Sequence, residues 1–300
     1  MTTFDTQYTI LANDILETGE WSNNRTGVRT KFKIGKLLEF DLSKEFPILT
    51  TKYVYWRSAI SEMVGFIRGY DNAADFRNIG CNVWNQNANE NKEWLKNPNR
   101  KGTDDLGRIY GVQWREWDAG LLTQTSENTF EIDQPVDQLK MVVDDLSKDI
   151  DNRREIVTAW NPGEMSIMAL PPCHMTMIFS LVEEKTKVDL FVVIRSSDVG
   201  LGLPFNTAQY AFLLNFIARI TNKKVGTLRI YLNNVHIYEN HIDGIKEQLK
   251  RMPLICNPKL DLSDDLSSLE ALETTSKPIQ DLIHLNDYEY HPAIKLPMAV

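Results

Sequence analysis

Hydrophobic residues recur at intervals of three or four positions in several stretches of the chain, a pattern typical of helices with one buried face. A further stretch, which opens at Pro204, Phe205 and Asn206, is apolar on nearly all sides, as expected for a helix inside the core. The predicted helices cover residues 6–18, 56–68, 136–148, 204–220 and about 241–252.

Apolar runs rich in β-branched and aromatic residues predict the strands. Two of these runs lie between Met168 and Ile220, where a short polar turn joins them into a pair. Others cover residues 31–42, the segment after Arg154 and most of residues 225–241. Helices and strands are interleaved and no Pro-, Gly- or Ser-rich linker divides the chain. We therefore predict an α/β (α+β) fold with a single domain over residues 1–300.

Three segments stand apart from this pattern. Residues 71–108 are polar and uneven, with Trp84 and Trp94 as apolar anchors, and predict a surface excursion centred on about residues 86–105. The acidic stretch 258–285 predicts loops and one more short helix or strand. The last five residues are apolar and uncharged, so we expect them to pack against the body of the protein rather than fray.

Charge and cysteine content narrow the possible partners. The formal net charge of -8 argues against a nucleic-acid partner, because a phosphate backbone needs a basic face. No apolar run could cross a bilayer and the acidic N-terminus is not a signal peptide, so we expect a cytoplasmic protein without membrane contact. Cys81, Cys173 and Cys256 lack zinc-finger spacing and cannot all pair, so we expect reduced thiols and no metal.

Cys173 is the strongest candidate for a nucleophile. The thiolate is the reactive form of cysteine, and nearby arginine or histidine side chains lower the thiol pKa. The alternative is an inert buried cysteine, the commoner fate of a single Cys. Arginines are suited to bidentate contacts with phosphate, and several are candidates for an anion site near the thiol: Arg25, Arg153, Arg154 and Arg195.

Two further polar residues have both a functional and a structural interpretation. Glu62 lies within an apolar helical pattern, where a buried carboxylate must be paired or protonated, although it could lie at the edge of the helix face. Asn206 stands at a helix entrance and could be only an N-cap. Its side-chain amide could instead pair with the imide edge of a pyrimidine ring.

Several motifs together resemble the thymidylate synthase family over nearly the whole chain. They are PPCH at 171–174, RSSDVGLGLPFN at 195–206, HIYENH at 236–241, NNRTG at 23–27, TTK at 50–52, RIYGVQW at 108–114 and NRRE at 152–155. The segment 86–105 resembles the longer bacterial members. The resemblance implies a large mixed β-sheet packed by helices, with one sheet face forming a homodimer interface.

The resemblance also implies a reaction: transfer of a one-carbon unit from 5,10-methylenetetrahydrofolate to C5 of dUMP, with reduction to dTMP. The catalytic residues that the resemblance implies are Cys173, Glu62, Asn206, Tyr110 and Arg195. Substrate binding would fall to Arg25, Ser196, Asp198, Asn206, His236 and Tyr238, joined by Arg153 and Arg154 from the second subunit. Binding of the reduced folate would fall to Trp84, Asp198, Lys52 and Val300.

Four positions depart from the family pattern: Ile178, Ile194, Gly200 and Asn234. We expect them to alter the sheet interface and the residues behind the site. They leave room for a second hypothesis, a dUMP 5-hydroxymethylase in which water rather than hydride completes the reaction. A third hypothesis is a non-catalytic relative that binds nucleotide or RNA as a regulator. The presence of Cys173, Glu62 and Asn206 favours an enzyme.

Overall fold

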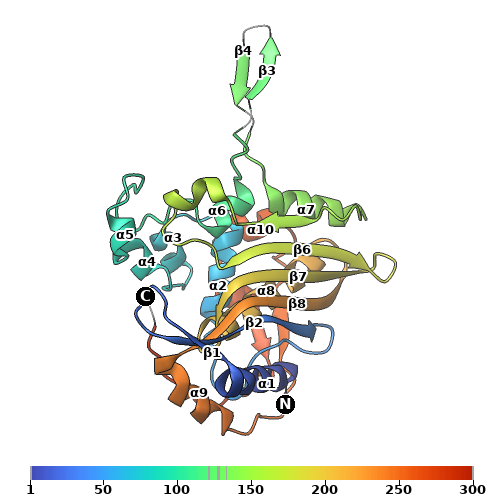
Figure 1. The fold of residues 1–300 in the computed structure, drawn as a ribbon. Coiled ribbons are helices and arrows are strands. Elements are labelled where there is room, and N and C mark those ends of the chain that lie inside the picture. The colour runs from blue at the N-terminus through green and yellow to red at the C-terminus, as the bar shows by residue number, and fades with distance from the viewer. Residues whose placement is uncertain (1, 121, 127–128, 133, 299–300) are drawn as a thin grey trace.

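A six-stranded mixed sheet forms the centre of the protein (Figure 1). The computed structural model describes residues 2–120, 122–126, 129–132 and 134–298. The strands follow the order β1-β2-β8-β7-β6-β5. Their bounds are β1 Glu20–Ser22, β2 Thr30–Asp41, β5 Ile156–Thr158, β6 His174–Val182, β7 Lys187–Asp198 and β8 Lys224–Tyr238. All neighbours are antiparallel except β7 and β8, which are joined through helix α8, Gly202–Ile220. The predicted α/β architecture with a mixed sheet is confirmed.

One face of the sheet is buried beneath helices. Helix α8 packs on β7 and β8, and α2, Trp56–Ile67, packs against α8. Alternate residues of β7 point into this core, and Val188, Val192 and Ile194 are fully buried there. Since adjacent strand residues point to opposite faces, Phe191 and Val193 lie on the other face. Ile194 therefore belongs to the core and not to the open face, which was one of the two places, with the residues behind the site, where we expected the departures to act.

The open face carries a row of apolar side chains in cross-strand register. Ile156 of β5 pairs with Ile178 of β6, which pairs with Phe191 of β7. A parallel row joins Leu37 of β2, Tyr231 of β8 and Val193 of β7. Leu37 is 54% exposed and Ile156 is 42% exposed. The departure at Ile178 therefore adds apolar surface to this face.

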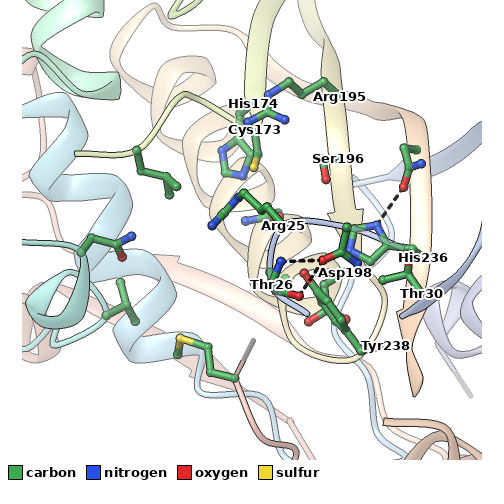
Figure 2. A pocket seen from close by; sticks show the side chains of 18 of the residues that line it. Arg25, Thr26, Thr30, Cys173, His174, Arg195, Ser196, Asp198, His236 and Tyr238 are labelled. Atoms are coloured by element: carbon green, nitrogen blue, oxygen red, sulfur yellow. Dashed lines mark hydrogen bonds between the residues drawn. The ribbon is translucent and has the colours of Figure 1, made fainter. Parts of the chain in front are cut away.

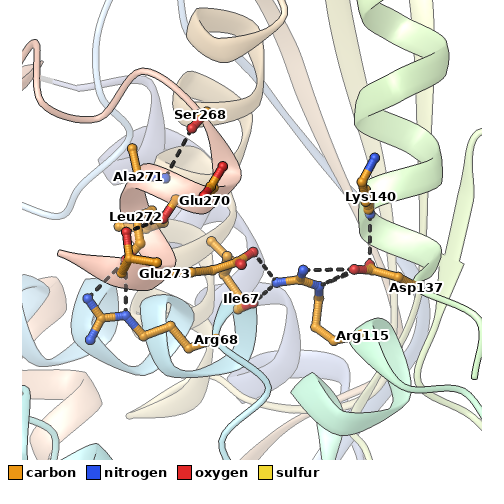
Figure 3. A network of polar contacts seen from close by, with 11 residues as sticks. Ile67, Arg68, Arg115, Asp137, Lys140, Ser268, Glu270, Ala271, Leu272 and Glu273 are labelled. Atoms are coloured by element: carbon orange, nitrogen blue, oxygen red, sulfur yellow. Dashed lines mark hydrogen bonds and ion pairs between the residues drawn. The ribbon is translucent and has the colours of Figure 1, made fainter.

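Arg115 joins four helices at one end of the molecule (Figure 3). It is the last residue of α6, Tyr110–Arg115, and its guanidinium pairs with Asp137 at 2.7 Å and Glu273 at 2.5 Å. Asp137 caps α7, Gln138–Ser147, and Glu273 lies in α10, Leu269–Thr274. The same guanidinium donates to the carbonyl of Ile67 at the end of α2. This cluster fixes the helix that carries Glu62.

The remaining elements surround this core. Helix α1, Thr3–Thr18, packs beside β2, and α9 is Ile242–Leu249. The polar region predicted as an excursion contains α3 Ala73–Asn78, α4 Asn85–Asn89 and α5 Lys92–Leu95. Trp94 of this region is buried, and its indole N–H donates to the carbonyl of Asp105 at 2.7 Å. Short 3-10 helices cover Pro162–Ile167 and Glu239–His241.

Two segments differ from the sequence prediction. Residues 258–285 hold more than one short element: β9 Lys259–Leu262, α10, α11 Ile279–Leu282, and β10, which begins at Ile283 and ends at Asn286. A hairpin of β3, Leu122–Ser126, and β4, Thr129–Ile132, was not predicted and projects from the body (Figure 1). Within the described ranges, no helix is both long and apolar enough to cross a membrane.

Candidate active site

The turn before β6 presents Cys173 at the mouth of a cavity. The guanidinium of Arg195 donates from Nε to the carbonyl of Pro172 at 2.8 Å and from Nη2 to the carbonyl of Pro171 at 3.1 Å. The backbone N–H of Arg195 donates to the carbonyl of Cys173 at 2.9 Å, and the Cys173 N–H donates to the Tyr110 hydroxyl oxygen at 2.7 Å. These bonds hold the thiol-bearing turn rigidly between β7 and α6.

The cavity has a volume of about 620 Å³ and gathers most of the candidate residues (Figure 2). Figure 2 shows the side chains of Arg25, Cys173 and Ser196 directed toward a common space. Of the sequence-predicted residues, those that line the cavity are Arg25, Glu62, Trp84, Tyr110, Cys173, Arg195, Ser196, Asp198, Asn206, His236 and Tyr238. Residues spread along the chain from Arg25 to Tyr238 thus meet at one place.

Burial dominates the electrostatics of Cys173. Desolvation raises the pKa of the thiol above its ordinary value, and Arg195, Tyr110 and Arg25 only partly oppose this effect. The two arginines lower the thiol pKa, as the sequence predicted, but burial outweighs them and the net shift is upward. The balance is between loss of water, which favours the neutral thiol, and two cations, which favour the thiolate.

Glu62 is buried inside the protein and not at the edge of the helix face. It is 7% exposed, and Gln209 Nε2 donates to its Oε2 at 2.5 Å. Burial raises the pKa of Glu62 to about 8, against the opposing effects of the Gln209 amide and the Trp84 indole. The carboxyl therefore holds a proton at neutral pH and can donate it into the cavity.

Asn206 lies within α8 and does not cap it. The helix begins at Gly202 with Leu201 as the N-cap residue, so the N-cap interpretation of Asn206 is wrong. The side chain of Asn206 donates from Nδ2 to Gln209 Oε1 at 3.0 Å. Gln209 is fully buried one helical turn further along and was missed by our sequence analysis. The available signal was that Gln209 follows Asn206 by three residues, a spacing that puts the two side chains on the same face of a helix.

His174 forms part of the same wall. Its ring lies 5.3 Å from the rings of both Tyr110 and Tyr210, and the residue is 6% exposed. Burial lowers the pKa of His174 to about 4, against the opposing effect of the Asn206 amide. A neutral imidazole with one donor and one acceptor nitrogen therefore adjoins Asn206.

The far end of the cavity is built by the ends of β7 and β8. His236 Nδ1 lies 2.9 Å from Asn234 Oδ1, so the departure at Asn234 supplies a neutral partner that orients the imidazole. Asp198 accepts hydrogen bonds from the backbone N–H groups of Gly200 at 2.8 Å and Leu201 at 3.2 Å. Burial raises the pKa of Tyr238, which keeps its hydroxyl protonated.

A second, more apolar cavity of about 490 Å³ adjoins the first and shares Glu62, Asp198 and Tyr238 with it. Lys52 lines this second cavity, and its amine donates to the carbonyl of Gly200. Burial lowers the pKa of Lys52 to about 8, with Asp198 opposing the shift. Met298 of the C-terminal segment borders both cavities, whereas Val300 lies outside the described residues.

The C-terminal segment packs against the body at two glycines. A Cβ atom at Gly200 would lie 2.6 Å from His241 Nδ1 and 2.9 Å from Leu296 Cδ1. A Cβ atom at Gly244 would lie 2.5 Å from Leu296 Cδ2. His241 Nε2 also lies 2.6 Å from the carbonyl oxygen of Pro297. The expected packing is therefore found for Leu296 and the Pro297 carbonyl, and the departure at Gly200 makes room for Leu296, whereas the side chain of Met298 is 59% exposed.

Arg153 and Arg154 are not brought to this cavity within one chain. Both side chains are exposed and precede β5, the edge strand of the sheet. Arg153 has a positive φ of 63°, which places it in a tight turn. The two arginines are therefore available to another molecule and not to the cavity of their own chain.

Comparisons with known proteins agree with this arrangement. A family model described as thymidylate synthase matches residues 6–300. The chain is 45% identical to a thymidylate synthase of Shewanella halifaxensis over 300 residues, covering 98% of this chain and 99% of the relative. It is 40% identical to a thymidylate synthase of Pseudomonas putida over 322 residues, again covering 98% of this chain and 99% of the relative. The chain therefore belongs to the thymidylate synthase family.

Proposed function

We infer that the protein methylates dUMP to dTMP, using 5,10-methylenetetrahydrofolate as the co-substrate. The observation that carries the assignment is that Cys173 shares one cavity with two cations that act on its thiol, Arg195 and Arg25, and with the Asn206 amide. A nucleotide needs an anion site for its phosphate and an amide or similar group to recognise its base, and the cavity that holds the thiol is lined by both Arg195 and Asn206.

The phosphate is held by Arg25, Arg195 and Ser196. Two nitrogens of the Arg195 guanidinium are bonded to the carbonyls of Pro171 and Pro172, which leaves Nη1 for the ligand. Arginine is preferred for phosphate because its planar fork supplies directed, charge-assisted hydrogen bonds. His236 and Tyr238 hold the ribose hydroxyl, a role supported by their position in the cavity lining at the end of β8.

The chemistry begins with addition of the Cys173 sulfur to C6 of the uracil ring. Addition moves the ring electrons toward C5 and O4, which makes C5 a nucleophile. Arg195 and Arg25 favour the thiolate that attacks, and the hydrogen bond from Cys173 to Tyr110 fixes the direction of attack. Glu62, protonated at neutral pH, supplies the acid for O4 and in its ionised form accepts the C5 proton, through water.

The second cavity fits a reduced folate. Its lining is mainly apolar, which suits the stacking of planar rings, and Asp198 and Lys52 add hydrogen-bonding groups at its edge. Trp84 lines the neighbouring cavity and contributes an apolar wall near Cys173. When bound, the folate supplies the one-carbon unit and the hydride. Met298 borders both cavities and Leu296 packs beside Gly200, so closure of this segment over the bound folate would exclude water from the site.

The protein acts as a homodimer through the open face of the sheet. Exposed apolar rows of this kind mark protein–protein contacts, and a two-fold axis lets the same surface serve both subunits. Pairing two such faces carries Arg153 and Arg154 of one chain toward the phosphate site of the other. That arrangement explains why these arginines are exposed in the single chain.

Release of tritium from [5-³H]dUMP tests the assignment directly. We expect release that depends on methylenetetrahydrofolate and that is abolished in Cys173→Ala, while Cys173→Ala still binds dUMP. The matched control is Cys81→Ala, because Cys81 is buried and its pKa is raised by burial, so its thiol is unreactive. Release by Cys173→Ala at the wild-type rate would remove the nucleophile assignment.

A further inference from the structure

Three polar side chains link α8 to α2 through a hydrogen-bond chain in which each amide nitrogen donates to the next side chain. Asn206 Nδ2 donates to Gln209 Oε1 at 3.0 Å, and Gln209 Nε2 donates to Glu62 Oε2 at 2.5 Å. Gln209 is fully buried and lies behind Asn206 rather than among the residues that line the cavity. Each amide in the chain therefore has a fixed orientation, with its nitrogen on the side of the carboxyl group.

The orientation of Asn206 matters because a primary amide is nearly symmetric in shape. With its oxygen toward N3–H and its N–H toward O4, the amide pairs with uracil. After a half-turn about χ2 it would offer N–H to N3 and its oxygen to the 4-amino group, and would pair with cytosine. The size of the pocket cannot distinguish these two states. A neighbouring group has to set the direction in which the Asn206 amide faces.

We propose that Gln209 is the residue that sets this direction: anchored on Glu62, it holds the Asn206 amide in the orientation that reads uracil and disfavours cytosine nucleotides. The inference rests on the proposed role of Asn206 as the base reader. Gln209 is a positioning residue, since it acts through Asn206.

Glu62 determines the direction in which the hydrogen bonds of this hydrogen-bond chain are donated. Burial favours the protonated carboxyl, and because Oε2 accepts from the Gln209 nitrogen, the proton lies on Oε1. Oε2 then remains an acceptor whether the carboxyl group is neutral or ionised, so only the nitrogen of Gln209, and not its oxygen, can form a hydrogen bond with it. Reversing Gln209 would place two acceptor oxygens against each other. Base selection and proton transfer therefore require the same arrangement of Glu62.

The other polar neighbour of Asn206 cannot make this choice. Burial keeps the His174 ring neutral, so either of its nitrogens can carry the single proton. A neutral imidazole can accept from the Asn206 nitrogen or donate to the Asn206 oxygen, and thus serves both orientations. That leaves Gln209 as the neighbour that discriminates between them.

The test is the ratio of dCMP to dUMP dissociation constants, measured by calorimetry without folate so that the readout does not depend on turnover. In Gln209→Met the anchor is lost while the side-chain volume is kept. We expect the ratio to fall by about tenfold or more, with weaker dUMP binding and tighter dCMP binding. The matched control is Gln113→Met, because Gln113 is also buried and donates to a carboxylate, Glu164, at 2.6 Å. The control should keep the wild-type ratio.

A second variant keeps the proposal falsifiable if Gln209→Met does not fold. In Glu62→Gln the new amide can present either its oxygen or its nitrogen to Gln209, so Gln209 can adopt either orientation and no longer fixes that of Asn206. We expect the dCMP to dUMP ratio to fall here too. Ratios within about threefold of wild type in every folded variant would overturn the inference, as would an equal fall in Gln113→Met. A wild-type protein that does not bind dUMP would instead refute the proposed function.

Discussion

The hydroxyl oxygen of Tyr110 accepts a 2.7 Å hydrogen bond from the backbone N–H of Cys173, across 63 residues of sequence. Burial holds the pKa of Tyr110 well above its ordinary value, so the hydroxyl stays protonated and cannot act as a base. Its role is to fix the turn that carries the thiol. The same ring stacks on Phe66 of α2 with ring centroids 4.8 Å apart, which ties that turn to the Glu62 helix.

Removing this hydroxyl should slow turnover more than it weakens nucleotide binding. In Tyr110→Phe the Cys173 N–H loses its acceptor, which costs on the order of 1–3 kcal/mol when the group is buried. We expect kcat to fall at least about tenfold with little change in dUMP affinity. Tyr288→Phe is the control, since its hydroxyl also accepts from a backbone N–H, that of Val54, at 3.2 Å. Equal kcat values for the two variants would contradict the positioning role of Tyr110.

Subunit mixing tests whether the arginines before β5 act on the other subunit. Cys173→Ala and Arg154→Ala are each expected to be nearly inactive as homodimers. After random exchange, half of the dimers are hybrids with one complete site, which predicts about one quarter of wild-type activity. Absence of recovery in hybrids proven by mass spectrometry would argue against shared sites. A monomeric protein in light scattering would remove the idea altogether.

The raised pKa of Glu62 predicts a pH dependence of stability. The folded state binds the Glu62 proton more tightly than the unfolded chain, because burial raises its pKa from 4.5 to about 8. The contribution of the protonated Glu62 carboxyl to the free energy of unfolding is therefore lost as the pH rises from the unfolded pKa to the folded pKa. We expect the Tm of wild type to fall relative to Glu62→Gln between pH 5 and pH 8, values taken from that window. Parallel Tm profiles would show that Glu62 is ionised in the folded protein.

The packing of Leu296 against Gly244 predicts that a substitution that favours the helix will loosen the C-terminal segment. Alanine is favoured over glycine in a helix by about 1 kcal/mol, yet Gly244→Ala would put a Cβ atom 2.5 Å from Leu296 Cδ2. We expect amide hydrogen exchange at Ile294, Lys295, Leu296 and Met298 to accelerate about fivefold, for a displacement cost of ~1 kcal/mol.

The double variant identifies the cause of that acceleration. Gly244→Ala/Leu296→Ala should exchange no faster than Leu296→Ala alone, because the clash no longer exists. Gly163→Ala is the control, as its Cβ atom would meet nothing nearer than Asn161 Oδ1 at 3.4 Å. Unchanged exchange in Gly244→Ala would show that Leu296 is not held by the glycine.

The sequence was informative wherever a motif carried both the chemistry and the local geometry. Cys173 behind two prolines and Asn206 near a helix start lie where these motifs predicted, although Asn206 is inside the helix and not at its cap. The sign of the Cys173 pKa shift was not predictable, because burial depends on how α6, β6 and β7 meet in space. Gln209 was missed because a glutamine among apolar helix residues resembles a surface position until its partner on α2 is known.

The identity of the nucleotide product tests the central claim most directly. The same covalent adduct at Cys173 can end in hydride transfer or in attack by water, and the protein controls the outcome by excluding water. The space beside Gly200 is filled by His241 and Leu296, so this departure from the family pattern opens no route for water. Chromatography of the products should therefore show dTMP, with one dihydrofolate formed per nucleotide and seen as a rise in absorbance. Hydroxymethyl-dUMP as the main product, without dihydrofolate, would contradict the account.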